Sequence, residues 1–188
     1  MAYNLDHIIV LIADDMKPML ELTKNVLQTF GFKHIHLAEN GEEAFDLTCK
    51  HNPDFIITDW LMEPMDGIEF IKKVRTSEAS PNPFVPVIMM TGFSSKLRVE
   101  SARDNGITEF LVKPFTAKDL YARVFQIIEK PRQFVSTEEF FGPDRRRKKI
   151  KDYVGPRRRN HDDLQNENST NTQAIDILKK LSEETKKI

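Results

Sequence analysis

Five polar side chains stand at the carboxyl ends of short apolar runs of the sequence. They are three carboxylates, one hydroxyl and one amine: Asp14, Asp15, Asp59, Thr91 and Lys113. Carboxylates gathered in one place repel one another, and burial raises their pKa values unless a cation compensates. Mg²⁺ is the natural compensating ion because it is hard and prefers oxygen ligands. The hydroxyl and the ammonium could then hold a phosphoryl group as its oxygens become negative, so the set predicts phosphoryl transfer onto a carboxylate.

Short buried runs alternate with helical spacing up to residue 130, as expected for βα units that feed a parallel sheet. Strands are predicted at residues 8–13, 35–38, 54–58, 85–90 and 107–112. Helices are predicted between them, at residues 19–30, 40–50, 68–75, 95–104 and 116–129. The fold class is therefore α/β, a doubly wound (βα)₅ sheet of flavodoxin-like strand order 2-1-3-4-5. Ligands of such a sheet bind at the carboxyl ends of the strands, where the five polar residues stand.

Two helix ends are marked by local signals. Gly31 follows the first predicted helix and should stop it, because glycine readily takes the left-handed conformation of a helix end. Thr116 and Asp119 have the spacing of an N-cap residue and its capping-box partner at the start of the fifth helix.

The regular pattern ends at Pro131, which divides the chain into two parts. Residues 1–130 form the predicted domain, and residues 131–188 form a basic, mostly irregular extension. Residues 1–131 carry 14 Lys and Arg against 19 Asp and Glu, whereas residues 132–188 carry 14 against 10. The extension is too poor in large apolar residues to bury a core of its own, although residues 173–187 recover a short helical pattern.

Four segments resemble the motifs of response-regulator receiver domains of the chemotaxis type, the single-domain phosphoacceptors of bacterial two-component signalling. They are LIADDM, IITDWLMEPMDG, VIMMTG and EFLVKPF, in the order and spacing of that family. The resemblance covers roughly residues 5–130. It implies that Asp59 accepts the phosphoryl group. It also implies that Asp14 and Asp15 hold Mg²⁺, Asp15 directly, together with Asp59 and the backbone carbonyl of Leu61.

The resemblance also assigns roles on the other side of the site. Thr91 would donate a hydrogen bond to a phosphoryl oxygen, and Lys113 would form an ion pair with the same group. The Lys113–Pro114 peptide should be cis. Phe110 occupies the switch-aromatic position, whose ring swings inward when Thr91 is drawn to the phosphoryl group.

Two positions depart from the family pattern. The proline that usually follows the phosphoacceptor by four residues is replaced by Glu63, with Pro64 after it, which could alter the loop over the site. Gly92 stands where alanine is usual and leaves more room beside the phosphoryl group.

The fifth predicted helix carries a second apolar stripe, Tyr121, Phe125 and Ile128, besides the one expected to pack on the sheet. In the family this face docks outputs or dimers, so the stripe is a candidate output surface. The alternative is that three phenylalanines of the extension fold back and cover it, namely Phe134, Phe140 and Phe141.

The segment from Arg145 to Arg159 holds nine basic residues and one acid, Asp152. It could bind nucleic acid, an anionic membrane surface or an acidic protein, or it could be a solvated tail. No DNA-reading motif follows it, which disfavours sequence-specific DNA binding.

No apolar run of the sequence is long enough to cross a bilayer, and no signal-peptide pattern opens it. The single cysteine, Cys49, cannot form an internal disulfide and is predicted to be a small buried residue of a helix. These features predict a cytoplasmic protein.

The sequence therefore predicts a signalling protein that receives a phosphoryl group from a sensor histidine kinase or a histidine phosphotransfer protein. Self-phosphorylation and autodephosphorylation would be its only chemistry, and its output would be protein–protein contact. The alternative is that its basic extension binds nucleic acid directly. A phosphohydrolase of the same fold class is disfavoured because Leu61 stands where a second catalytic acid would follow Asp59.

Overall fold

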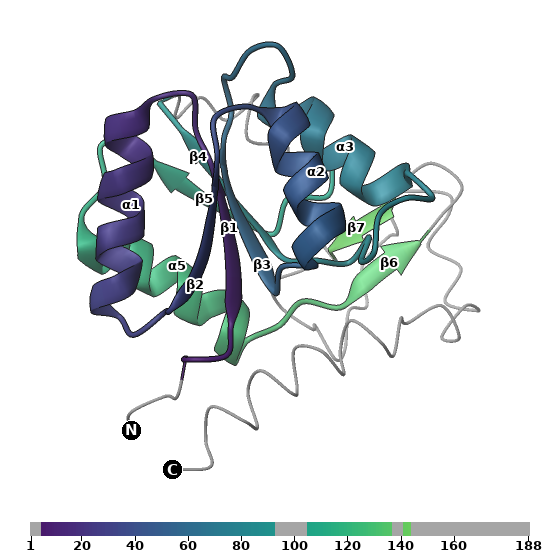
Figure 1. Ribbon diagram of the computed structural model, residues 1–188. Helices are drawn as coiled ribbons and strands as arrows, with labels where there is room; N and C mark the ends of the chain where they lie inside the picture. Colours follow the sequence, from purple (N-terminus) through teal and green to yellow (C-terminus); the bar gives the residue numbers. More distant parts are fainter. Residues whose placement is uncertain (1–4, 93–104, 137–140, 144–188) are drawn as a thin grey trace, which may run out of the picture.

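Five parallel strands form one sheet through the middle of the protein (Figure 1). The computed structural model describes residues 5–92, 105–136 and 141–143. The strands are β1 (Ile9–Ala13), β2 (His34–Ala38), β3 (Phe55–Asp59), β4 (Val87–Thr91) and β5 (Glu109–Val112). Their order is β2-β1-β3-β4-β5, which confirms the doubly wound sheet and the strand order predicted from the sequence.

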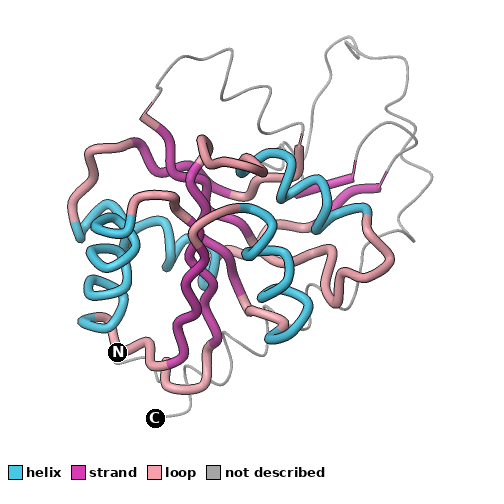
Figure 2. The backbone as a smooth tube through the Cα atoms, turned by 45° about the horizontal axis from the view of Figure 1, so that its top comes forward, coloured by secondary structure: helices cyan, strands magenta, loops and turns pink. Residues whose placement is uncertain are grey.

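Helices cover both faces of this sheet, and Figure 2 shows the strands running between them. The described helices are α1 (Lys17–Thr29), α2 (Gly41–His51), α3 (Gly67–Thr76) and α5 (Ala117–Glu129). The first and last of them lie on one face, and α2 and α3 lie on the other (Figure 1). The helix predicted at residues 95–104 lies outside the described residues. Within the part that is described, none of the helices has the length and hydropathy of a membrane span.

The side chains of β1 explain why both faces must be covered. Val10 and Ile12 belong to the core under α1 and α5, whereas Leu11 and Ala13 belong to the core under α2 and α3. Successive side chains of a strand point to opposite faces, so an uninterrupted apolar strand must be buried on both. All four are at most 1% exposed.

Both predicted helix-end signals are confirmed. Gly31 has a left-handed φ of 103°, and its N–H donates to the carbonyl of Gln28 at 3.0 Å. At the start of α5, the Thr116 hydroxyl accepts the N–H of Asp119 at 3.2 Å, and the Asp119 carboxylate accepts the N–H of Thr116 at 2.9 Å. The Thr116 hydroxyl also donates to Asp119 Oδ2 at 2.6 Å, and this hydrogen bond, together with the one from the Thr116 N–H, lowers the pKa of Asp119.

A short antiparallel pair follows α5, formed by β6 (Phe134–Ser136) and β7 (Phe141–Pro143). These two short strands stand in the part of the chain after Pro131 that the sequence predicts to be mostly irregular. One of them has a long-range contact: Phe134 is only 5% exposed and meets the ring of Phe84 edge-on at 5.4 Å. The predicted helix at residues 173–187 and the Arg-rich segment lie outside the described residues.

Cys49 is exposed near the end of α2, so the prediction of a buried cysteine is wrong. Its thiol lies 3.4 Å from the carbonyl oxygen of Ala79. The buried face of this helix is made by Ala44, Phe45 and Thr48 instead. Helical spacing alone did not reveal which face of α2 turns toward the sheet.

Candidate functional site

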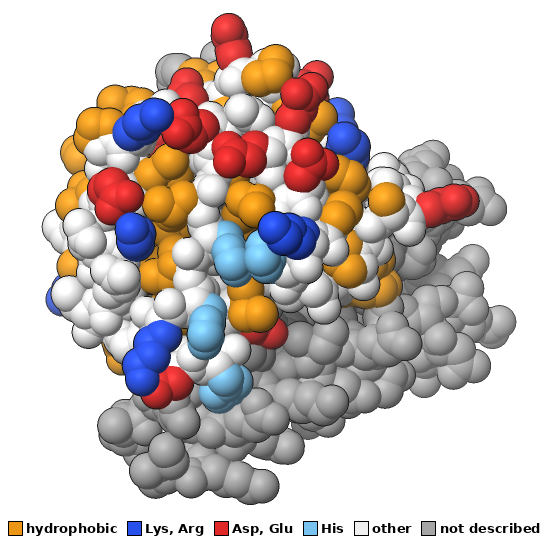
Figure 3. All heavy atoms as spheres, in the orientation of Figure 1, with side chains coloured by type: hydrophobic (Ala, Val, Ile, Leu, Met, Phe, Trp, Pro, Cys, Tyr) orange, Lys and Arg blue, Asp and Glu red, His pale blue; other side chains and the backbone are white. Residues whose placement is uncertain are grey.

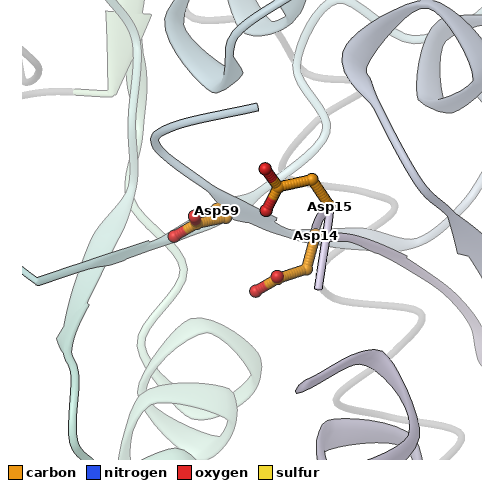
Figure 4. Close-up of side chains that lie close together, drawn as sticks. All are labelled: Asp14, Asp15 and Asp59. Atoms are coloured by element: carbon orange, nitrogen blue, oxygen red, sulfur yellow. The ribbon is translucent and has the colours of Figure 1, made fainter. Parts of the chain in front are cut away.

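The carboxyl ends of β1 and β3 bring three aspartates together (Figure 4). Asp14, Asp15 and Asp59 each place a carboxylate oxygen within 4.8 Å of those of the other two. The two strands are neighbours with Ala13 opposite Thr58, so the residues that follow must lie close together. Asp14 is buried, Asp15 is exposed and Asp59 is intermediate. The cluster is therefore shielded from solvent at Asp14 and open to solvent at Asp15.

A single ammonium group neutralises the buried side of this cluster. Lys113 Nζ lies 2.7 Å from Asp14 Oδ2 and 2.9 Å from Asp59 Oδ1. The other oxygen of Asp14 accepts the N–H of Met16 at 2.9 Å. Opposite charges attract more strongly in such a partly buried place than on the surface. Lys113 thus fixes the two aspartates relative to each other.

Thr91 is fully buried at the end of β4, the strand that lies between β3 and β5. Its carbonyl accepts the N–H of Lys113 at 2.8 Å. On the other side, the N–H of Trp60 donates to the carbonyl of Met90 at 3.0 Å. These two backbone hydrogen bonds align the carboxyl ends of three strands. All five polar residues singled out in the sequence therefore lie at one edge of the sheet.

The electrostatics of the site favour an added cation. Burial raises the pKa of Asp59, against the opposing hydrogen bond and charge of Lys113, and the Asp14 carboxylate raises it further. Burial alone would lower the pKa of Lys113, but its hydrogen bonds to Asp14 and Asp59 raise it. Lys113 is therefore held as a cation, while the charged form of Asp59 gains from any further positive charge.

Two glycines hold the loop between β3 and α3 over the site. The N–H of Gly67 donates to the carbonyl of Trp60 at 2.9 Å, and a Cβ on Gly67 would lie 2.0 Å from the carbonyl oxygen of Asp59. The N–H of Gly41 donates to the carbonyl of Met65 at 3.1 Å, and a Cβ there would lie 2.6 Å from that oxygen. Neither position has room for a side chain.

Gly41 and Gly67 were not among the residues predicted for the site. Each directly follows a helix N-cap residue, Asn40 or Asp66. Glycine is unfavourable in a helix, so its presence at the first position of two helices needs a reason. One such reason is that another part of the backbone passes too close to leave room for a Cβ. The sequence did not show which residues approach these glycines, namely Met65 at Gly41 and Asp59 at Gly67.

Residues 10–125 match the family model of the response regulator receiver domain. The chain belongs to this family. The matched part contains every residue of the site described above and ends within α5. The pair β6–β7 and the Arg-rich segment lie beyond it.

The relatives of this receiver include chemotaxis proteins. CheY-3 of Vibrio cholerae is 34% identical over 121 residues, which are 64% of this chain and 92% of the relative. CheY of Pseudomonas aeruginosa is also 34% identical over 121 residues and is covered to 96%. The solved structure of CheY4 of Vibrio cholerae has a TM-score of 0.59 at 31% identity, covering 64% of this chain and 98% of that one. A CheX–CheY–BeF3–Mg²⁺ complex from Borrelia burgdorferi has a TM-score of 0.58 at 27% identity, covering 64% and 88%.

Two peptide bonds beside the receiver site are cis. One is Lys113–Pro114, as predicted. The other is Glu63–Pro64, in the loop where the sequence departs from the family pattern. The displaced proline is therefore accommodated within the loop that follows Asp59.

Two further predicted site residues are placed but not tested by the structure. Leu61 lies in the loop after Asp59 with its side chain 54% exposed, and metal binding by its carbonyl stays a prediction. Phe110 of β5 is half-buried and packs against Met89 and Ile107. Its role as the switch aromatic also stays a prediction.

The predicted output stripe on α5 is mostly buried. Tyr121 is 44% exposed, but Phe125 is 8% and Ile128 only 2% exposed, so an exposed stripe of three residues is wrong. The reason is that Phe125 and Ile128 lie in the core that also holds Leu20 and Leu27 of α1. Phe30, directly after that helix, meets the Tyr121 ring edge-on at 5.3 Å. Tyr121 in turn stacks on Phe125 at 4.0 Å.

The alternative cover for this stripe, the phenylalanines of the extension, does not hold for Phe134. That ring packs on Phe84, and its nearest cation is Arg75 of α3. Phe140 lies outside the described residues, and the description of Phe141 is limited to its backbone pairing with Ser136.

Proposed function

We propose that this response regulator accepts a phosphoryl group on Asp59, from the phosphohistidine of a sensor kinase or a histidine phosphotransfer protein. The observation that carries the proposal is the position of Lys113 Nζ, within 2.9 Å of both Asp14 and Asp59, two carboxylates that cluster with the exposed Asp15. A nucleophile, a cation and a set of oxygen ligands thus share one edge of the sheet. That is the combination that phosphoryl transfer onto a carboxylate requires.

The donor set suits Mg²⁺. Three carboxylate oxygens within 4.8 Å of one another, one of them exposed, fit a hard cation that prefers oxygen and keeps several waters. Asp14, Asp15 and Asp59 would hold the ion together with the carbonyl of Leu61. When bound, Mg²⁺ supplies positive charge beside the oxygens of the transferring phosphoryl group.

The chain's own residues account for the transfer step. A carboxylate oxygen of Asp59 attacks the phosphorus, a P–O bond forms and the P–N bond to the donor imidazole breaks. The imidazole nitrogen keeps the electron pair of that bond and takes a proton from solvent. Lys113 then pairs with a phosphoryl oxygen, and the Thr91 hydroxyl donates a hydrogen bond to another. Later attack by water returns the free carboxylate and releases inorganic phosphate.

The output proposed for this receiver is a change in protein–protein contact. Phosphorylation adds charge where Lys113 and Thr91 lie, which biases the half-buried Phe110 between two positions. A shift from 1:99 to 99:1 requires about 5.5 kcal/mol of differential stabilisation. The Borrelia burgdorferi relative was solved with CheX, BeF3 and Mg²⁺ together, which supports an output of this kind. Tyr121 is the exposed part of the predicted output surface.

Trp60 offers a direct test because it is the only tryptophan and adjoins Asp59. Beryllofluoride, a phosphoryl mimic, should change its fluorescence saturably in the presence of Mg²⁺ and raise the unfolding temperature of the full chain. Neither change should occur in EDTA or in the Asp59→Asn variant. A full-chain protein whose fluorescence and unfolding temperature both ignore the mimic would overturn the proposal.

A second candidate function follows from the charge of residues 145–159, nine basic side chains against one acidic. Direct binding of nucleic acid by this segment would release counterions, so its affinity should fall steeply with salt. Affinity for a random duplex measured at about 50 and 200 mM salt tests this against a variant with Arg157, Arg158 and Arg159 changed to Gln. Equal affinity of the two proteins would exclude this function for the triplet.

A further inference from the structure

Arg75 near the end of α3 is a buried cation whose hydrogen bonds go to backbone carbonyls. Its guanidinium donates to the carbonyls of Pro83 at 2.7 Å, Val85 at 2.7 Å and Gly106 at 2.9 Å. Its Nε has no hydrogen-bond partner among the described residues. Burial lowers the pKa of Arg75 to about 9. Such a group is costly to bury, so whatever covers it matters to the local structure.

The cover comes from beyond the part of the chain that matches the receiver family. Phe134 of β6 places its ring 5.1 Å from the Arg75 guanidinium carbon, within reach of a cation–π interaction. The same ring meets Phe84 edge-on at 5.4 Å. Figure 1 shows the chain leaving α5 on one side of the sheet and reaching β6 on the side of α3. We call residues 131–136 the strap, because they cross the end of the sheet between its two helical layers.

A second contact holds the strap on its α5 side. Arg132 Nη2 donates to Glu109 Oε1 at 2.6 Å, and Glu109 is only 3% exposed in β5. Arg123 of α5 lies farther from the same carboxylate, at 3.7 Å, and is more exposed. Of these two cations, Arg132 is therefore the closer and more buried partner, and its loss would weaken the hold of the strap on Glu109.

The strap therefore contacts the amino end of β5 through Glu109, and it reaches the segment before β4 through Phe84 and Arg75. Val85 precedes β4, which ends at Thr91. Gly106 and Glu109 lie at the start of β5, which leads to Lys113. Arg75, which lies over the Phe134 ring, donates to the carbonyls of Val85 and Gly106. A shift of β4 or β5 along its axis would therefore move Arg75 and disturb its contact with Phe134. Packed interiors transmit such shifts because they have few voids.

We propose that the strap is a built-in reporter of phosphorylation: seated while Asp59 is free, it loosens from Arg75 and Glu109 when Thr91 and Lys113 are drawn to a phosphoryl group. The proposal rests on the function proposed above and adds its regulatory element. The Arg-rich segment at 145–159 follows the strap and its partner strand β7 in the sequence, so loosening of the strap would change how that segment is presented to a partner.

Hydrogen exchange of the full chain tests the proposal. With beryllofluoride and Mg²⁺, the backbone amides of residues 132–136 should exchange at least about fivefold faster than with Mg²⁺ alone, the lower end of usual allosteric coupling. The Asp59→Asn variant should show no such change. If Trp60 fluorescence confirms that the mimic is bound but exchange in the wild type is unchanged or slower, the proposal that the strap reports phosphorylation is refuted. The proposed function would still stand. Failure of the mimic to bind would instead refute both the strap proposal and the proposed function.

Linkage requires the reverse effect as well. Phe134→Ala and Arg132→Gln each weaken the seated strap, so both variants should bind beryllofluoride at least about fivefold more tightly than the wild type. The matched controls are Val135→Ala, whose side chain is 37% exposed on the same strand, and Arg123→Gln, the more distant partner of Glu109. Two strap variants guard against a folding defect in one of them. Affinities equal to those of the controls would refute the coupling.

Discussion

The ammonium of Lys113 lies 2.9 Å from the carboxylate of Asp59, although Asp59 ends β3 and Lys113 follows β5, with β4 between these strands. The same ammonium lies 2.7 Å from Asp14, so one cation serves two buried or half-buried carboxylates. A phosphoryl group on Asp59 could replace the carboxylate oxygen as the ion-pair partner of Lys113. The proposed Mg²⁺ would add positive charge to the same carboxylate cluster that Lys113 contacts, and this division of charge yields the first prediction.

Replacing Lys113 with Gln should destabilise the metal-free protein by about 1–3 kcal/mol, because Asp14 is fully buried and would lose its cation. Added Mg²⁺ should then stabilise the variant more than the wild type. Urea unfolding with and without Mg²⁺ measures both effects. Lys118→Gln, on the exposed face of α5, is the matched control and should behave as the wild type. A variant as stable as this control would show that the ion pair contributes nothing.

Gly67→Ala should disrupt the loop over the site, because a Cβ at this position would lie 2.0 Å from the carbonyl oxygen of Asp59. Forcing an extra methyl group into packed structure costs about 1–3 kcal/mol, and the affinity for beryllofluoride should fall with it. Gly92→Ala is the control, since within the described part of the chain no heavy atom of another segment lies within 4 Å of a Cβ there. The unfolding temperatures of both variants test this prediction. An equal decrease in the two would contradict the close approach of Gly67 to the Asp59 carbonyl.

His36 should titrate below the ordinary histidine pKa of 6.5 because burial and the neighbouring His51, whose ring stacks on it at 3.7 Å, both disfavour its charged form. Figure 3 shows histidine side chains gathered on this face of the molecule. The unfolded chain binds the proton first, so this residue's contribution to stability is present above pH 6.5 and is lost as pH falls through the lowered pKa.

Imidazole resonances in an NMR titration report this directly. The His36 pKa should lie below 6.5 in the wild type and rise in His51→Gln, which removes one of the repelling groups. His36 in turn should account for part of the acid sensitivity of unfolding, so His36→Gln should flatten that dependence. A His36 pKa at or above 6.5 would refute the electrostatic description of this pair.

Most of the fold and the central site could be predicted from the sequence because both depend on local order. Apolar runs and helical spacing alternate regularly, and a parallel sheet must place the residues after Ala13, Thr58, Met90 and Val112 at one edge. Lys113 could therefore be placed beside Asp59 from its position in the chain alone.

The features that could not be predicted depend on contacts between distant segments. The exposure of Cys49 follows from how α2 is rotated on the sheet, and Phe125 and Ile128 are buried in a core that they share with α1. Neither is encoded in the helix itself. Phe134 offered no local sign of its partners, Phe84 and Arg75, which are drawn from other elements.

Location of the phosphoryl group tests the central claim most directly. The full chain is incubated with Mg²⁺ and acetyl phosphate, reduced with borohydride, which converts an aspartyl phosphate to homoserine, and digested for peptide mass spectrometry. The account predicts homoserine at position 59, lost in EDTA and absent from Asp59→Asn. An unmodified Asp59 in the presence of Mg²⁺, or homoserine at position 14 or 15 instead, would contradict it.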